Sequence, residues 1–275
     1  ERSGKVPLGK RDLPGQDPAR QAGSTGERKD FSMQLADKIA LVTGGGSGIG
    51  LATALALAKE GCRVAIAGRN GEKLRAAAEG QTEGPPIISR ACDVAEPADV
   101  AGLFDWLRQQ IGAPEILVNS AGINVRRRSM AELDPGDWEQ MIRINLTGAF
   151  HCIRAALPEM RRRQAGLIVN ISSVSGKRAS ALGGPGYCAS KFALAGLGTA
   201  IGLEERANGI HVTNIYPGEV ATPILAQRPT PVPPERLAAM LRPEDIAEMV
   251  VAIARLPDRA IVPELVITPM YQEYA

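Results

Sequence analysis

The sequence predicts an α/β fold, a single domain in which helices cover both faces of a doubly wound parallel sheet. Three observations support this prediction. Short apolar segments alternate with longer helical patterns from residue 37 onward. Segments such as Ile116-Leu117-Val118 are apolar without alternation, which is typical of strands covered on both faces. A glycine-rich turn follows the first strand, at the carboxyl edge where such a sheet binds its ligands.

Strands and helices are expected in alternation along the chain. Each strand is a short apolar run, and we expect strands at residues 38–43, 63–67, 87–91, 115–119, 166–171, 210–215 and 261–267. Each helix is a longer stretch between two such runs, and we expect helices at residues 48–60, 71–79, 97–111, 136–163, 186–207 and 243–256. Residues 223–241 are rich in proline, which restricts the backbone, so this segment is expected to form a semi-rigid flap.

Length and charge limit the domain organisation and the partners. The 275 residues are close to what one hydrophobic core supports, so one domain is expected over residues 33–275. Residues 1–32 combine charges, glycine and proline without apolar periodicity, which predicts a disordered leader. The formal net charge is only +2. Nothing in this balance indicates nucleic acid or an anionic membrane as a partner.

Cysteine and histidine usage indicates neither disulfides nor metal ligands. The four cysteines fall in predicted core elements without ligand or framework spacing, which favours reduced thiols in a cytoplasmic protein. His151 and His211 have no ligand-spaced partners, so no metal site is expected. No apolar run reaches the roughly 20 residues that a membrane helix needs.

The glycine turn runs from Thr43 to Gly50, directly after the apolar residues Ile39 to Val42. Glycines let the backbone approach a pyrophosphate closely. The helix that follows presents free N–H groups and the positive end of its dipole. A glycine-rich turn can also be purely structural, so this motif needs a second signal.

The second signal is the pair Tyr187 and Lys191, four positions apart on a predicted helix. This spacing puts both side chains on one face. A free tyrosine has a pKa of about 10, and a nearby ammonium is expected to lower it, which makes Tyr187 a usable general acid or base. The alternative is a packing tyrosine followed by a solvated lysine.

A serine at the end of the fifth strand completes the expected chemistry. Ser173 can donate a hydrogen bond to a substrate carbonyl oxygen as negative charge develops on it. Ser172 and Ser175 compete for this role, and the strand alternation favours Ser173.

The end of the second strand bears on the choice of cofactor. NAD-binding turns place a carboxylate about 20 residues after the glycine loop, to accept hydrogen bonds from the ribose 2′-hydroxyl. This chain has Gly68 and Arg69 there, and a guanidinium can pair with a 2′-phosphate. NADP(H) is therefore favoured, NAD(H) remains possible, and the arginine can instead stack on adenine.

From about residue 36 to 222 the chain resembles the short-chain dehydrogenase/reductase family. The matching motifs, in order, are TGxxxGxG at Thr43, Gly44, Gly48 and Gly50, then Asn119-Ser120-Ala121-Gly122, Asn145, Ser173, the YxxxK pair Tyr187 and Lys191, and Pro217-Gly218. Ser120 departs from the family's usual asparagine. The resemblance implies a Rossmann fold and a homodimer or homotetramer.

The resemblance also implies the site residues. The catalytic set is Asn145, Ser173, Tyr187 and Lys191, in which the asparagine holds a water near the lysine; Asn145 can instead merely satisfy backbone groups. The residues expected at the cofactor are Gly44, Ser47, Gly48, Ile49, Gly50, Arg69, Asn70, Asp93, Val94, Asn119, Ala121, Gly122, Tyr187, Lys191, Pro217, Gly218, Val220 and Thr222. Asn119 is expected to brace the sheet.

The expected activity is the interconversion of a carbonyl and a secondary alcohol. The substrate is a small molecule, either a 3-oxoacyl thioester or a small ketone or 3-hydroxy acid. The alternative is a scaffold or redox sensor that binds NADPH without turnover.

Two features remain outside this scheme. Arg126, Arg127 and Arg128 form either a solvated rim, an inter-subunit contact or a site for an anionic substrate or carrier. Glu219 follows the Pro-Gly turn and is expected to be a solvated loop residue, with a contact to a polar or cationic substrate as the alternative.

Overall fold

The computed structural model describes residues 34–273, so the leader expected at residues 1–32 lies outside the described residues. One parallel sheet has the strand order β3-β2-β1-β4-β5-β6-β7. The strands are β1 (Ile39–Thr43), β2 (Arg63–Gly68), β3 (Ile88–Ala91), β4 (Ile116–Asn119), β5 (Gly166–Ile171), β6 (Ile210–Pro217) and β7 (Glu264–Ile267). The order reverses between β1 and β4, so the sheet is doubly wound, as predicted. Ligands of such folds bind at this switch point, at the carboxyl ends of the strands.

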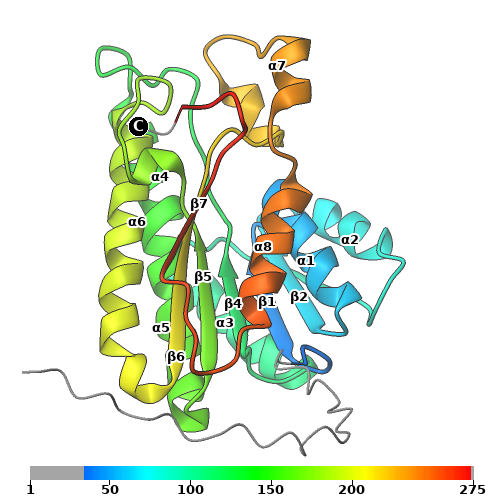
Figure 1. Cartoon of the computed structure of the whole chain (residues 1–275). Coiled ribbons are helices and arrows are strands. Elements are labelled where there is room, and N and C mark those ends of the chain that lie inside the picture. The colour runs from blue at the N-terminus through cyan, green and yellow to red at the C-terminus, as the bar shows by residue number, and fades with distance from the viewer. Residues whose placement is uncertain (1–33, 274–275) are drawn as a thin grey trace, which may run out of the picture. The chain divides into compact units, whose positions relative to one another are not determined.

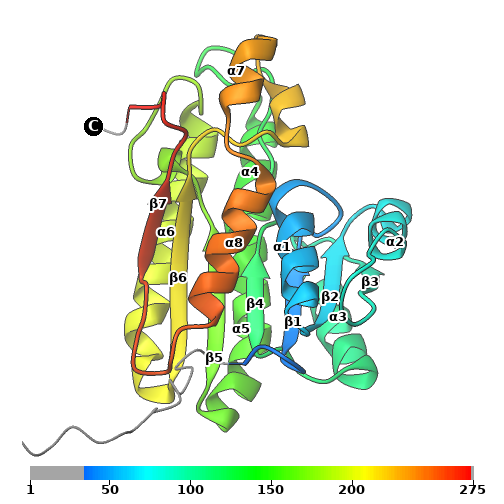
Figure 2. The same ribbon diagram turned by 45° about the vertical axis from the view of Figure 1, so that its right-hand side comes forward.

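Helices cover both faces of the sheet (Figure 1, Figure 2). They are α1 (Gly48–Lys59), α2 (Gly71–Glu79), α3 (Pro97–Gln110), α4 (Pro135–Ile142), α5 (Gly148–Arg163), α6 (Pro185–Glu204), α7 (Pro234–Ala239) and α8 (Pro243–Ala254). Proline fixes a helical φ and needs no hydrogen bond at the first position of a helix, and α3, α4, α6, α7 and α8 all begin with proline. None of the helices in residues 34–273 has the length and apolar character needed to span a bilayer.

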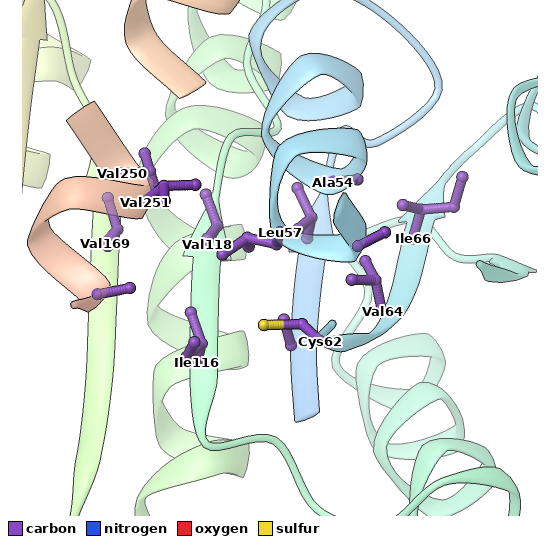
Figure 3. Close-up of a cluster of buried hydrophobic side chains, with 14 of the residues drawn as sticks. Ala54, Leu57, Cys62, Val64, Ile66, Ile116, Val118, Val169, Val250 and Val251 are labelled. Atoms are coloured by element: carbon purple, nitrogen blue, oxygen red, sulfur yellow. The ribbon is translucent and has the colours of Figure 1, made fainter. Parts of the chain in front are cut away.

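Two apolar layers hold the sheet between its helices. On one face α1 and α8 pack on the strands through side chains such as Leu57, Val118 and Val250, all fully buried (Figure 3). On the other face α3 and α5 supply residues such as Phe104 and Ile153. Strand residues point alternately to the two faces, which explains why these strands are apolar throughout.

Three predicted elements differ in detail. The single helix expected at residues 136–163 is interrupted by one π-helical turn, Arg143–Thr147, between α4 and α5. The proline-rich flap contains a 3-10 turn, Pro223–Gln227, and the short helix α7. The last strand begins at Glu264 instead of residue 261, directly after Pro263, whose nitrogen cannot donate to a ladder.

Candidate active site

The glycine turn between β1 and α1 is a close backbone contact. Gly44 and Gly48 have positive φ angles of 66° and 55°, a region that glycine adopts without strain. A Cβ on Gly50 would lie 2.5 Å from the Gly44 carbonyl oxygen, so a side chain there would force the turn open. Ser47 precedes α1 without a side-chain capping bond. The Ser47 side chain therefore accepts no hydrogen bond from the first-turn N–H groups of α1. An anion site at this helix end requires N–H groups that are not already bonded in this way.

The hydroxyl of Thr43 joins the ends of β1 and β4. Its Oγ1 accepts hydrogen bonds from the backbone N–H groups of Ser120 and Ala121, both at 3.2 Å. A Cβ on Gly44 would lie 2.9 Å from the Ala121 backbone. The two loops at the switch point are thus held against each other, and backbone atoms of both lie at the surface where the sequence predicts the cofactor.

Two adjoining cavities lie at this edge of the sheet, with volumes of about 650 Å³ and about 220 Å³. They share the lining residues Gly44, Ser47, Arg69, Gly122 and Ile123. Most of the expected site residues line one cavity or both; Gly50, Asn119 and Asn145 line neither. The paired cavities form an elongated cleft across the switch point.

The smaller cavity lies beside the start of α2. Arg69 is exposed at its rim, and the Asn70 side chain accepts a hydrogen bond from the Lys73 backbone N–H at 2.9 Å, which caps α2. Asp93 also lines this cavity, and its carboxylate accepts from the Ala95 N–H at 3.0 Å. Asn70 and Asp93 therefore stabilise local turns in addition to facing the cavity.

Lys73 also lines the smaller cavity, and the sequence reasoning missed it. Its Cγ lies 3.6 Å from where a Cβ on Gly46 would stand, so its stem passes beside the glycine turn. The available signal was its position in the first turn of the helix expected at residues 71–79, directly after Arg69 and Asn70.

Ser173, Tyr187 and Lys191 come together in the larger cavity. A side-chain hydrogen bond joins Ser173 to Tyr187. The Lys191 ammonium lies 5.6 Å from the centre of the Tyr187 ring and donates to the Ile171 carbonyl oxygen at 2.8 Å. The competing serines bond elsewhere: Ser172 donates to the Lys191 carbonyl oxygen at 3.1 Å, and the Ser175 hydroxyl lies 3.4 Å from another serine hydroxyl.

Burial shifts the pKa values of the tyrosine and the lysine in opposite directions. Burial lowers the pKa of Lys191 to about 8, because the charged amine loses its hydration. Burial also raises the pKa of Tyr187, while the hydrogen bond from Ser173 acts against that rise. The expectation that the ammonium lowers the tyrosine pKa is therefore wrong for this structure, in which desolvation of the phenolate dominates.

Asn145 sits in the π-helical turn and is buried. Its Oδ1 accepts from the Ile123 N–H at 2.8 Å, and its Nδ2 donates to the Ile123 carbonyl oxygen and to Ser190 Oγ, both at 3.0 Å. Ser190 in turn donates to the Tyr187 carbonyl oxygen at 2.8 Å. Asn145 Oδ1 and Lys191 Nζ each lie 3.5 Å from where a Cβ on Gly122 would stand. Asn145 thus satisfies backbone groups, which is the alternative that the sequence left open, and it lies beside Lys191.

A row of buried asparagines positions α6, and the sequence indicated only its first member. Asn119, Asn170 and Asn214 lie side by side on β4, β5 and β6. Asn119 Nδ2 donates to Asn170 at 3.0 Å, and Asn170 Nδ2 donates to Asn214 at 3.1 Å. Asn214 donates to the Ala195 carbonyl oxygen of α6 at 3.2 Å. Asn119 therefore braces the sheet, as expected, and does not line the cofactor cavities.

Glu219 is not a solvated loop residue, as was expected; its side chain is only 8% exposed. Its carboxylate accepts from Arg236 of α7 at 2.7 and 2.9 Å and from the Tyr271 hydroxyl at 2.7 Å. Its backbone N–H donates to the Gln272 side chain at 2.9 Å. The carboxylate thus ties the Pro-Gly turn, the flap and the C-terminal segment together.

Arg128 departs from the expected exposed arginine rim, whereas Arg126 and Arg127 are exposed as anticipated. Arg128 is only 7% exposed and lines the larger cavity. Its stem packs on Gly184 at the start of α6. Spacing alone gives no signal that separates the third arginine from its neighbours, because only the surrounding loops bury it.

Comparisons with known proteins agree on one class. A family model described as short chain dehydrogenase matches residues 38–232. An oxidoreductase of Staphylococcus aureus (strain MRSA252) is 35% identical over 239 residues, which cover 86% of this chain and 99% of the relative. The closed form of serine dehydrogenase complexed with NADP+ is similar with a TM-score of 0.80 and 29% identity, covering 86% of this chain and 97% of that one. A variant of actinorhodin polyketide ketoreductase with NADPH is similar with a TM-score of 0.79 and 32% identity, covering 86% and 98%.

Proposed function

The chain belongs to the short-chain dehydrogenase family and is an NAD(P)-dependent dehydrogenase or reductase, and from this premise we propose that it interconverts a carbonyl and a secondary alcohol with NADP(H). The observation that carries the proposal is the meeting of Ser173, Tyr187 and Lys191 in the larger cavity. The names of two similar structures, a serine dehydrogenase and a ketoreductase, support an alcohol or ketone as the reacting group.

The cleft fits a dinucleotide. Gly44 and Gly48 leave the backbone bare at the start of α1, where a pyrophosphate binds well. Lys191 uses one of its three N–H donors on the Ile171 carbonyl oxygen, which leaves donors for the nicotinamide ribose. When bound, the cofactor supplies or accepts the hydride in the larger cavity.

The protein residues bind the substrate oxygen and move a proton. Ser173 and Tyr187 each donate their one hydroxyl proton to the carbonyl oxygen, so the Ser173 proton that is bonded to Tyr187 in the structure turns to the substrate. Tyr187 gives its proton to the oxygen in reduction and takes it back in oxidation. The high pKa of Tyr187 keeps the proton in place at neutral pH. Asn145 positions α6 through Ser190 and lies near Lys191, where it can hold a relay water.

Replacement of the tyrosine tests this mechanism. Tyr187→Phe removes the proton donor and keeps the ring, so we expect kcat to fall by about 10²- to 10⁴-fold. Fluorescence titration should show NADPH binding close to wild type. A variant that reduces carbonyl compounds at the wild-type rate would contradict the mechanism. A protein that binds NADPH yet shows no turnover with any carbonyl in a broad panel would favour the sensor alternative.

The preference for NADP(H) rests on the cations beside the smaller cavity. Arg69 and Lys73 line it, and no carboxylate occupies the end of β2. We expect NADPH to bind at least tenfold more tightly than NADH, and Arg69→Ala to abolish the difference, a change of about 1.4 kcal/mol. Arg75→Ala, which removes an exposed arginine of α2 outside the cavity lining, is the matched control. Equal affinities in the wild type would contradict the preference.

Assembly and location complete the proposal. Phe150 on α5 and Phe192 and Leu203 on α6 are exposed apolar side chains, which supports a homo-oligomer. All four cysteines are free and buried, as suits a reducing cytoplasm. Light scattering of the purified protein gives the subunit number directly.

A further inference from the structure

Arg128 is a buried guanidinium whose hydrogen bonds within the described residues all go to backbone carbonyl groups. Its Nε donates to the Val125 carbonyl oxygen at 2.7 Å and its Nη1 to that of Leu182 at 2.9 Å. Its Nη2 donates to the Gln227 carbonyl oxygen of the flap. Arginine carries five N–H donors, so these three bonds leave two N–H groups for a ligand.

No carboxylate among residues 34–273 forms an ion pair with Arg128. Burying a charge is unfavourable unless an opposite charge accompanies it. Burial lowers the pKa of the Arg128 guanidinium, and the positive charge of Arg228 lowers it further. The protein thus keeps a buried positive charge in contact with a cavity, without neutralising that charge itself.

A second arginine reinforces this charge. The Arg228 side chain is 13% exposed, lines the same cavity and lies 3.5 Å from Glu219. Glu219 is the single carboxylate among the described lining residues, and its two oxygens are already bound by Arg236. The substrate end therefore has an excess of positive charge from two arginines.

The excess charge lies next to the reacting group. The Arg128 stem passes within 3.0 Å of where a Cβ on Gly184 would stand, three residues before Tyr187. Arg128, Ser173 and Tyr187 line the same cavity, so a ligand whose carbonyl oxygen is bound by Ser173 and Tyr187 lies in one cavity with the guanidinium.

We propose that the substrate is a free hydroxy or oxo acid whose carboxylate is held by Arg128 and Arg228. This inference rests on the proposed function, and it selects between the two substrate classes that the sequence left open. A free acid supplies the missing negative charge, and the planar guanidinium matches a carboxylate with paired hydrogen bonds. A thioester carbonyl compound is neutral at this position and leaves Arg128 without a counter-charge, while Arg228 has only the Glu219 carboxylate that it shares with Arg236.

Binding to the NADPH complex tests the proposal without turnover. The probes are butyrate and butyramide, which differ in charge but little in shape, and the readout is the fluorescence of bound NADPH. We expect butyrate to bind wild type at least tenfold more tightly than butyramide. Arg228→Gln and Arg128→Lys should each weaken butyrate binding at least fivefold and leave butyramide within twofold. Arg126→Gln, in the same loop but outside the cavity lining, is the matched control and should change neither.

Three results would overturn the proposal. One is equal affinity of wild type for butyrate and butyramide. Another is equal weakening of both probes by the arginine variants, which would mean that the arginines act only by holding the flap. The third is that inorganic phosphate changes the fluorescence of bound NADPH and butyrate does not. That result would indicate a phosphorylated substrate.

Turnover separates this inference from the proposed function. We expect 2-, 3- or 4-oxo acids to be reduced with a KM at least tenfold lower than that of their methyl esters, and Arg228→Gln to raise the KM for the acid alone. Selective butyrate binding without reduction of any acid or ester would leave the carboxylate site supported and would refute the proposed function. Reduction of esters with the same KM as acids would support the proposed function and refute the carboxylate site.

Discussion

The two ends of the cleft are built in opposite ways. The proposed cofactor end is centred on backbone atoms of one glycine turn, to which Gly44, Gly48 and Gly50 belong, packed against the loop after β4. The substrate end is a set of charged side chains from distant segments. Arg128 bonds to Gln227, 99 residues away, and Glu219 bonds to Tyr271, 52 residues away.

This difference teaches how one fold can keep its cofactor and change its substrate. Backbone contacts depend on the absence of side chains, so the cofactor end tolerates few substitutions. Side-chain charges on loops can be exchanged one at a time while the sheet stays the same. Substitutions at the two ends should therefore have different effects on the protein.

The largest expected effect comes from breaking the cofactor end alone. The added methyl group of Gly50→Ala would lie 2.5 Å from the Gly44 carbonyl oxygen, so the turn must open. We expect NADPH affinity to fall about a hundredfold, or about 2.7 kcal/mol, measured by fluorescence titration. Hydrogen exchange of the flap should stay as in wild type.

A second glycine provides the control. Gly196 lies on α6 with no atom within 4 Å of where its Cβ would stand. Gly196→Ala should leave NADPH binding unchanged and raise the free energy of unfolding by about 0.5 to 1 kcal/mol, because alanine favours the helix. A Gly50→Ala protein with wild-type affinity would remove the contrast between the two ends.

The next effect comes from breaking the substrate end alone. Glu219→Gln removes the charge that pairs with Arg236 and Arg228, and we expect the free energy of unfolding to fall by about 1 to 3 kcal/mol. Urea unfolding measures this loss, and hydrogen exchange should localise it to residues 219–241. Glu235→Gln, an exposed carboxylate of α7, should stay within about 0.5 kcal/mol of wild type.

Acid titration sharpens the same test. Burial raises the pKa of Glu219, but hydrogen bonds from Arg236 and Tyr271 outweigh it, and the net pKa is lowered. Because the carboxyl pKa is lower in the folded protein, ionised Glu219 stabilises the fold at pH values above about 4.3, the ordinary pKa of glutamate. This contribution is lost as the pH falls below that value. The stability difference between wild type and Glu219→Gln should therefore shrink below about pH 4. A difference that is constant with pH would contradict the ion-pair interpretation.

The last prediction concerns the buried ammonium of Lys191. Its pKa is about 8 in the folded protein, against about 10.4 when unfolded, so the unfolded chain holds more protons between these values. The stability of wild type relative to Lys191→Met should therefore rise from pH 8 to pH 10, by at most about 1.4 kcal/mol per pH unit. Urea unfolding at several pH values measures it, with Lys73→Met as the control for loss of an exposed ammonium. A flat relative stability would mean that the lysine is not desolvated.

Local sequence patterns predict the sheet, the glycine turn and the meeting of Ser173, Tyr187 and Lys191 in the larger cavity. These features are local: apolar runs mark buried strands, glycine permits a close turn, and four-residue spacing aligns Tyr187 with Lys191 on one helix face. The doubly wound order then follows from the alternation of strands and helices. Local sequence patterns therefore predict almost all of the proposed cofactor end.

Which charges are buried depends on long-range contacts in the folded protein. Arg126 and Arg128 belong to one run of three arginines, yet only Arg128 is buried, by bonds to the loops at residues 182 and 227. The sequence predicts Glu219 to be a solvated loop residue, but contacts from α7 and the C-terminal segment bury it. The sign of the Tyr187 pKa shift also follows from burial, which outweighs the neighbouring charge. Desolvation depends on all surrounding atoms, and those atoms come from segments that no local pattern connects.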